Sequence, residues 1–557
     1  VTAMMREAGF DAWVTLLRSG TSGDVNPSLP SLGGFNHAIV YVGGDSPFWI
    51  DPTSEFSFDG YLPLSDQNRW ALIASPQATG LIKTSISTAD DNKTVRNIEY
   101  TLNDIGFADV LETTTYYGAE DSIYRGRYLF MEEEDISTGI DEYIQRSYRF
   151  GENAGFEYSD TSDFSEHFNV SLKIEGVGRG VTEDSQAKVA IMQGELVNYL
   201  PDIFRIENDD EEVSERKDDY YFYKPFTFET RYTINPPEGF SLRELPEPEI
   251  VNLGDVTIEK YYSTSGDVVE AVLTLKSGKR SISAEEFEQT REKVTRFSKE
   301  NPILIVFDHI GEKLLAEGDY RGSIDYLKAV SDKEPEKEIH LIRLADALLE
   351  AGLGLDARLT AERAARLNDE SERAFSKLAW VLQHDELGVR FGPGYDRAGA
   401  IEAYKRAVEI DTDEWSNFAN LAILLEYDEN GLRYSNGDLR EAIETYKKIG
   451  DKLADKGMDI NIITNLLYLK DWKELYQALE KIENQKTVTL YKVVAFAAAE
   501  NFTAALSEAS KTGNAVDKRN ILSNAGELLI HIRNYTSAAV LLREAAKGSP
   551  DAMSLES

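Results

Sequence analysis

Two residues near the N-terminus, His37 and Asp51, have the types and the spacing that nucleophilic catalysis uses. His37 opens an apolar run that ends at Val42, and Asp51 follows a second run, Phe48–Ile50, beyond the pair Gly43-Gly44. A histidine can act as a general base. A carboxylate that accepts a hydrogen bond from one imidazole nitrogen fixes the tautomer and stabilises the imidazolium. This pair therefore indicates the base and the orienting acid of a catalytic triad.

The elements that must position this pair are two strands joined by a tight turn. A glycine pair between two apolar runs is typical of a β-hairpin. If the register is symmetric about Gly44, His37 lies directly opposite Asp51. Cross-strand partners are about 4.5–5.5 Å apart at Cβ. We therefore expect the two side chains to lie within hydrogen-bond reach.

The residues that would complete other kinds of site are missing. The chain has no cysteine, and its six histidines contain no HExxH pattern. Disulfides, cysteine-ligated zinc and a zinc-hydrolase motif are excluded within these residues. The glycine-rich segment 176–180 lacks the spacing of a phosphate loop, and the acidic run 132–135 lacks that of an EF-hand. We predict no cofactor and no metal.

Composition narrows the classes of partner. The 557 residues carry 98 acidic and 59 basic side chains, a net charge of −39. Nucleic-acid binding requires clustered Lys and Arg, so this balance argues against it. No apolar run approaches the roughly 18 residues of a membrane span. At roughly 150 residues per domain, the chain should form three or four units.

Three regions differ in pattern, and together they predict a multidomain α+β protein. Residues 1–85 begin with a short helix and continue as strands and turns. Residues 86–300 alternate polar and apolar side chains, as in Phe168–Ile174, which predicts a β-sandwich-like domain that ends in a helix over 281–299. A short helix is also expected around 186–199. Residues 301–557 are expected to be entirely helical.

The last region repeats with a period of 34 residues. This period resembles the tetratricopeptide repeat, a helical hairpin whose stacked copies form a superhelix. We expect an all-α solenoid of six or seven units that binds proteins or peptides. The positions that recur at this step are Phe307, Leu341 and Phe375; Ile310, Leu344 and Leu378; Gly311, Ala345 and Ala379; and Leu314, Leu348 and Leu382.

Two repeat units carry similar insertions between their helices, at 385–394 and 428–437. Either these are lengthened turns, or they form a paired feature on one edge of the solenoid that contacts a partner or a neighbouring domain.

The N-terminal segment resembles the transglutaminase-like superfamily, whose fold is a papain-like α+β core. The resemblance rests on His37-Ala38, on Trp49 before Asp51-Pro52-Thr53, and on a leading helix that ends at Gly9. It covers residues 1 to about 76 and implies that His37 is a general base and Asp51 its orienter. A β-domain followed by tetratricopeptide repeats is similar to large secreted or periplasmic bacterial proteins with this core. The resemblance therefore implies a periplasmic or extracellular location.

The sequence departs from that family at the nucleophile. The family's cysteine opens the leading helix, and this chain begins partway along it, so residues 1–85 correspond to the C-terminal part of the core. Two hypotheses follow. The first is a protein-interaction scaffold that carries a silent half-domain; the second is a thiol acyltransferase or cysteine peptidase whose cysteine lies upstream of Val1. We also expect an upstream segment or a partner subunit to cover Val1, Met4 and Met5.

Overall fold

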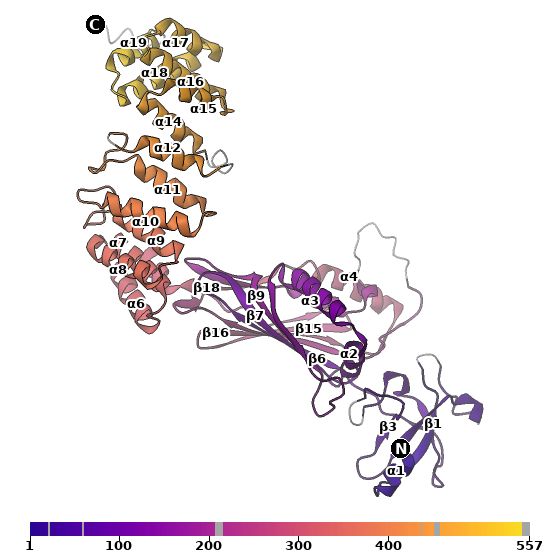
Figure 1. Ribbon diagram of the computed structural model, residues 1–557. Coiled ribbons are helices and arrows are strands. Elements are labelled where there is room, and N and C mark those ends of the chain that lie inside the picture. The colour runs from indigo at the N-terminus through magenta and orange to yellow at the C-terminus, as the bar shows by residue number, and fades with distance from the viewer. Residues whose placement is uncertain are drawn as a thin grey trace. The chain divides into compact units, whose positions relative to one another are not determined.

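The computed structural model divides the chain into two compact units, Val1–Lys313 and Leu314–Ser557. Its described residues are 1–20, 23–29, 31–57, 61–205, 216–435, 437–450 and 457–547. The first unit holds two main sheets and a separate two-stranded pair, and the second unit is helical (Figure 1). In the described part of the chain, no helix is long and apolar enough to cross a bilayer.

A five-stranded antiparallel sheet forms the N-terminal part of the first unit, in the order β3-β2-β1-β4-β5. It follows helix α1 (Thr2–Glu7), after which Gly9 has a φ of 89° that favours glycine. Leu17, Ile39 and Trp49 form its small core. The strands are β1 (Ala12–Leu17), β2 (His37–Val42), β3 (Phe48–Ile50), β4 (Trp70–Ile73) and β5 (Ile82–Lys83).

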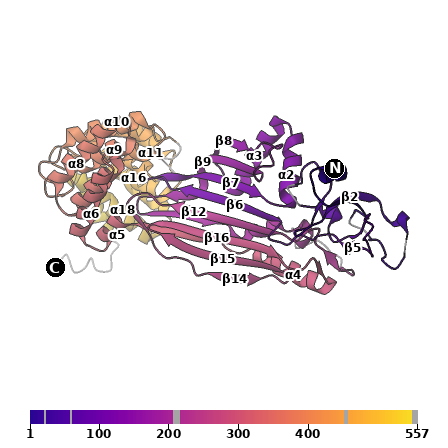
Figure 2. The same ribbon diagram turned by 90° about the horizontal axis from the view of Figure 1, so that it is seen from below.

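The larger sheet contains eleven strands in the order β13-β18-β10-β9-β7-β6-β12-β16-β15-β14, with β8 paired to β9. Figure 2 shows this order from β8 to β14. The pairing of β6 with β12 is parallel. The strands are β6 (Lys93–Thr101), β7 (Gly106–Tyr116), β8 (Glu152–Tyr158), β9 (Asn169–Thr182), β10 (Gln186–Ile191), β12 (Thr227–Asn235), β13 (Phe240–Leu242), β14 (Glu249–Asn252), β15 (Val256–Ser265), β16 (Val268–Ser277) and β18 (Ile303–His309); β11 (Tyr220–Tyr221) pairs separately with β17 (Ser281–Ile282).

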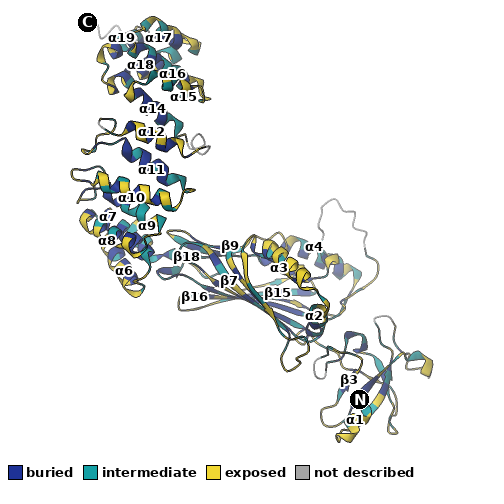
Figure 3. Cartoon of the chain, viewed as in Figure 1, coloured by how far each residue is buried: buried dark blue, intermediate teal, exposed yellow. Residues whose placement is uncertain are grey.

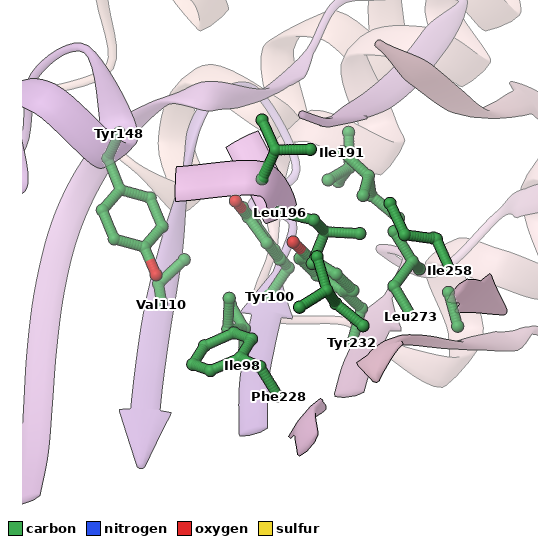
Figure 4. Packing of buried hydrophobic residues seen from close by; sticks show 14 of the residues in the cluster. Ile98, Tyr100, Val110, Tyr148, Ile191, Leu196, Phe228, Tyr232, Ile258 and Leu273 are labelled. Carbon is green, nitrogen blue, oxygen red and sulfur yellow. The ribbon is translucent and has the colours of Figure 1, made fainter. Parts of the chain in front are cut away.

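This arrangement corrects the expected β-sandwich. One continuous sheet is present, and helices rather than a second sheet cover its inner face. They are α2 (Ala119–Phe130), α3 (Glu133–Tyr148), the 3-10 helices η3 (Gln193–Tyr199) and η4 (Asp202–Phe204), and α4 (Ala284–Phe297). Side chains of α3, η3, η4 and α4 join those of the sheet in one core, part of which is shown in Figure 4. Alternation marks each strand's buried face but not the element that covers it.

Three local expectations are tested by these boundaries. The helix expected over 281–299 is α4, whose N-cap Ser283 forms a capping box with Glu286. The helix expected around 186–199 is instead strand β10 followed by η3. Residues 303–309 are strand β18, so the helical region begins at Ile310 rather than at 301. The alternating run Ile303–Phe307 pairs with β10 along its length, which explains the difference.

The second unit consists of consecutive helices that pack against one another. Helix α7 begins at Glu338 and α9 at Glu372, 34 residues later, so the predicted repeat is confirmed here. In Figure 3, helices such as α10 carry both buried and exposed residues. The helices are α5 (Ile310–Ala316), α6 (Tyr320–Lys333), α7 (Glu338–Glu350), α8 (Gly354–Leu367), α9 (Glu372–Leu382), α10 (Arg397–Ile410), α11 (Trp415–Leu425), α12 (Leu439–Lys447), α14 (Asp459–Leu469), α15 (Trp472–Leu479), α16 (Gln485–Ala498), α17 (Phe502–Ala509), α18 (Ala515–His531) and α19 (Tyr535–Ala546).

Candidate functional site

His37 and Asp51 lie together at one end of the small sheet. The imidazole Nε2 is 3.1 Å from Asp51 Oδ2. The other carboxylate oxygen, Oδ1, accepts hydrogen bonds from the backbone N–H of Thr53 at 2.9 Å and from its hydroxyl at 2.8 Å. Asp51 is therefore fixed by a turn of its own segment and presents its second oxygen to the histidine.

The expected proximity of the pair is confirmed, but the expected register is wrong. Val40 pairs with Ile50, and Tyr41 pairs with Trp49, so the hairpin is symmetric about Asp45 rather than Gly44. Asp51 follows the end of β3 and is a diagonal neighbour of His37, not its direct partner. A shift of two residues keeps side chains on the same face of a sheet, because side chains alternate with period two. The imidazole therefore still reaches the carboxylate.

A third residue, Asp66, completes this cluster and was not expected from the sequence. Its side chain is only 1% exposed, and its Oδ2 lies 3.7 Å from His37 Nε2. Within the described residues this Oδ2 has no hydrogen-bond partner. Asp66 sits in a 3-10 turn, η2 (Leu64–Asp66), between buried residues Leu64 and Gln67. No pattern in the sequence marks Asp66 as a member of this cluster.

The two carboxylates differ in acidity. Burial opposes ionisation of Asp51, but the hydrogen bonds from Thr53 and His37 outweigh it and hold the pKa of Asp51 below its ordinary value. Burial raises the pKa of Asp66, and the neighbouring Asp51 raises it further. The cluster therefore pairs an ionised Asp51 with an Asp66 that retains its proton more readily. The ionised member is the one that contacts the histidine.

The histidine presents one nitrogen, Nε2, to these carboxylates. Nε2 faces Asp51 and Asp66, and Nδ1 lies on the other side of the ring. The His37 side chain is 23% exposed, so the ring is not sealed from solvent. In a triad, the nitrogen remote from the acid takes the proton of the nucleophile. The sequence contains no cysteine to occupy that position.

The same three residues could hold a cation. His37 Nε2 and one carboxylate oxygen each from Asp51 and Asp66 lie within 4.8 Å of one another. Imidazole nitrogen and carboxylate oxygen are ligands that Zn²⁺ accepts. Such an ion would bind the nitrogen that now faces Asp51, so metal binding and the triad-like hydrogen bond exclude one another.

The residues expected to need a cover differ in exposure. Met4 is 73% exposed and Val1 is half-exposed, and none of the residues of α1 is buried. Met5 instead contacts the cluster of Ala12, Val40 and Val42 in the small sheet. The apolar surface of α1 is therefore only partly covered by this chain.

A separate cavity of about 370 Å³ lies within the helical unit. Its lining comes mainly from the first helices of successive units, α7, α9 and α11. Lys377 is paired with Asp346 at 2.5 Å, and Trp380 and Asn420 are half-buried. The lining residues are Ile342, Glu372, Arg373, Ser376, Lys377, Trp380, Tyr404, Glu414, Ser416 and Asn420.

The two inserted segments have the same construction. Asp385 Oδ1 accepts from the N–H groups of Leu387 and Val389, each at 2.9 Å, and Asp428 Oδ1 accepts from the equivalent groups two and four residues ahead at the same distance. Each insertion is also closed by one β-bridge between residues six positions apart, His384 with Arg390 and Tyr427 with Arg433. Leu387 is 74% exposed. Apart from Asn436, which lies outside the described residues, the expected likeness of the two insertions is confirmed.

One family model matches part of the first unit. Residues 196–307 match a family described as a domain of unknown function with a solved structure, DUF3858. No curated protein matches the chain.

Among solved structures, the chain is similar to MamA, at 21% identity over 36% of this chain and 96% of that chain, with a TM-score of 0.24. A putative protease from Parabacteroides distasonis is 12% identical over 55% of this chain and 42% of that chain, with a TM-score of 0.28. The C-terminal part of a TPR repeat-containing protein from Cytophaga hutchinsonii is 16% identical over 44% of this chain and 97% of that chain, with a TM-score of 0.31. These TM-scores are low, and the likenesses therefore carry no functional conclusion for this chain.

Proposed function

We propose that the protein is an interaction scaffold whose helical unit binds an extended polypeptide segment. The observation that carries this proposal is the cavity shared by helices α7, α9 and α11. Each of these is the first helix of its unit, so their facing side chains form one continuous surface. That surface offers an aromatic ring, Trp380, beside amide and charged groups such as Asn420 and Lys377.

This combination suits a peptide better than a small apolar ligand. A peptide presents backbone N–H and C=O groups at regular intervals, which amide side chains such as Asn420 can pair. An aromatic ring adds apolar contact at a low cost in conformational entropy. The ion pair of Lys377 with Asp346 fixes the lysine on this surface.

The test is peptide selection on the full chain. Peptides selected from a random displayed library would be labelled, and their binding measured by fluorescence polarisation. We expect Trp380→Ala and Asn420→Ala each to weaken binding about tenfold, the scale of a lost anchor contact. Arg363→Ala, an exposed residue of α8, is the matched control and should have no effect. Selected peptides that bind all three variants equally would show that this surface is not the binding site.

A second candidate, thiol acyl transfer, is supported by the 3.1 Å contact between His37 and Asp51. In this reading His37 takes a proton from a thiol and Asp51 holds the imidazole in place. The thiolate attacks the carbonyl carbon of an amide, the C–N bond breaks and the amine leaves with the proton that His37 took; an amine or water then attacks the thioester and frees the thiol. The thiol would belong to a segment upstream of Val1 in a longer protein, and that segment would also cover Met4. This second candidate includes a periplasmic or extracellular location.

Both candidates predict an inactive 557-residue chain, and they differ in what they predict for a longer form of the protein. The chain alone should show no transamidation, deamidation or peptidase activity on glutamine-containing peptides, because it has no thiol. A longer form with an upstream cysteine should be active, and His37→Ala should lower its kcat by several orders of magnitude. Turnover by the chain alone that survives His37→Ala would contradict the assignment of His37.

A further inference from the structure

A cavity of about 850 Å³ lies inside the first unit, between the inner face of the large sheet and the elements that cover it. Strands β6, β7, β9 and β12 form its floor, and α2, α3 and η3 form much of its wall. The size lies within the range that binds small organic molecules. It is separate from the cluster around His37 and from the helical unit.

The floor changes character along each strand. On β6, alternate residues share the inner face, and Ile98 and Tyr100 belong to the apolar core. Toward the cavity the same face continues as Arg96 and Thr94. On β7 the change is from Val110 to Glu112, followed by further polar positions. Charged groups on a covered sheet face cost free energy unless they are paired, so their concentration here requires an explanation.

Both carboxylate oxygens of Glu112 accept hydrogen bonds from protein groups, whereas one donor of Arg96 has no partner among the described residues. Glu112 accepts hydrogen bonds from the hydroxyls of Tyr143, at 2.7 Å, and Tyr148, at 2.5 Å. Arg96 donates through Nη1 to the hydroxyls of Tyr143, at 3.0 Å, and Tyr199, at 2.9 Å. Its Nε is buried and has no hydrogen-bond partner within the described residues. A half-buried guanidinium that lines a cavity is a binding group for an anion, because such groups pair well with carboxylates.

The wall leaves space that a side chain could have filled. Gly139 lines the cavity from the middle of α3, where glycine is among the poorest helix formers. A Cβ built at this position meets nothing within 4 Å. Gly139 is exposed, and the helix therefore accepts an unfavourable residue beside the cavity at a position where alanine would fit.

The charge at the cavity favours an anion in a chain that is otherwise strongly acidic. Two arginines of the covering helices, Arg127 and Arg146, are exposed lining residues. The acidic lining residues are occupied: Glu120 pairs with Lys224, and Glu195 with Arg179. Most of the remaining lining is aromatic or aliphatic. From this geometry we propose that the cavity binds an organic carboxylate with an apolar body, whose acid group accepts from Arg96.

The test uses cis-parinaric acid, a fluorescent carboxylate with an apolar chain, and its methyl ester, which lacks the charge. Both are titrated into the full chain. We expect the acid to bind about tenfold more tightly than the ester, the scale of one charge-assisted hydrogen bond. Arg96→Met should remove this difference. Arg96→Lys keeps the charge but not the planar group, so it should retain part of the difference.

Two further variants separate this cavity from other apolar surfaces. Gly139→Trp places a large side chain at an exposed lining position and should weaken binding of both probes, while Gln145→Trp, at an exposed position of the same helix that does not line the cavity, should leave both unchanged. Because Gly139→Trp leaves the Arg96 contacts in place, it remains informative if Arg96→Met does not fold. The proposal is overturned if the acid does not bind, if acid and ester bind equally to the wild type, or if Gly139→Trp binds as the wild type does.

Discussion

The rings of Phe391 and Tyr427 stack with their centroids 3.7 Å apart and their planes at 16°. Phe391 belongs to the insertion after α9, and Tyr427 stands at the start of the insertion after α11. A second contact, from the hydroxyl of Tyr395 to the carbonyl of Asp428 at 2.5 Å, joins the same two segments. The two insertions are therefore in contact with each other; that they contact a partner or a neighbouring domain stays a prediction.

Loss of either aspartate that closes an insertion should destabilise the helical unit. Asp385 and Asp428 each accept two backbone N–H groups, as an N-cap does. We expect Asp385→Ala and Asp428→Ala each to lower the free energy of unfolding by about 1–2 kcal/mol. Urea denaturation followed by circular dichroism measures this change. Glu386→Ala, the exposed neighbour, is the control, and an equal effect at Glu386 would contradict the role of the carboxylates.

The buried pair of Arg125 and Asp121 should be essential for the first unit. Both side chains are 0% exposed, and Arg125 Nε donates to Asp121 at 2.5 Å. The guanidinium also donates to carbonyls of the segment 160–166, among them that of Asp163 at 2.7 Å. Removing one member leaves a buried charge without its partner. We expect Asp121→Asn or Arg125→Met to cost about 3–5 kcal/mol of unfolding free energy, measured by chemical denaturation.

The exposed pair of Arg366 and Glu362 provides the contrast for that experiment. Because water screens exposed charges, Glu362→Gln should cost about 0–1 kcal/mol. Equal costs for the two pairs would contradict the effect of burial.

Asparagine substitutions at Asp66 and Asp51 should shift thermal stability in opposite directions. The pKa of Asp66 is raised in the fold, so the stability it contributes is present at low pH and is lost as pH rises through the folded pKa. Asp66→Asn should therefore raise Tm at pH 7 and lose this effect below about pH 4, the usual pKa of aspartate. The pKa of Asp51 is lowered, so its contribution is present at pH 7, and Asp51→Asn should lower Tm there.

Thermal unfolding followed from pH 3 to pH 8 measures both shifts. If both variants lowered Tm equally at every pH, the difference in acidity within the cluster would be refuted.

Gly139→Ala should stabilise the first unit. The added methyl meets no atom within 4 Å, and alanine is the better helix former by about 0.8–1 kcal/mol. The expected increase in unfolding free energy is therefore about 0.5–1 kcal/mol, measured by urea denaturation. The control is Gly178→Ala, where a Cβ would lie 2.6 Å from the ring of Phe150, so a loss of stability is expected. A destabilised Gly139→Ala would show that the space beside the helix is needed by the fold itself.

Much of the site geometry could be predicted from residue order, and the parts that could not have physical reasons. The proximity of His37 and Asp51 follows from the hairpin, because either register keeps both side chains on one face. The register itself depends on the turn, which the glycine pair alone did not specify. Asp66 comes from a different segment, and no local pattern links it to His37.

The fold was predictable where periodicity is local. Strands of the large sheet and most repeat helices follow from it. Helix α3 was also predictable, because Ile136, Ile140 and Ile144 are spaced four apart, as on one face of a helix, and they are buried. Pairing between strands that are far apart in the sequence leaves no such pattern. Phe307 fits the 34-residue period of the helices, yet it lies in β18 because a neighbouring strand was available to pair with it. The cavity beside Arg96 could not be predicted from the sequence, because threonine and tyrosine occur on either face of a strand.

The position of β18 has a consequence for how the protein is made. This strand lies between β10 and β13, yet β10 ends at Ile191 and β18 begins at Ile303. During translation, β10 therefore emerges long before the strand that covers its edge. Until Ile303–His309 leaves the ribosome, the nascent sheet exposes an open row of backbone donors and acceptors, which favours pairing with other chains. Correct folding of the first unit thus waits for the last strand of the nascent sheet, and a chaperone that shields this edge would act during that interval.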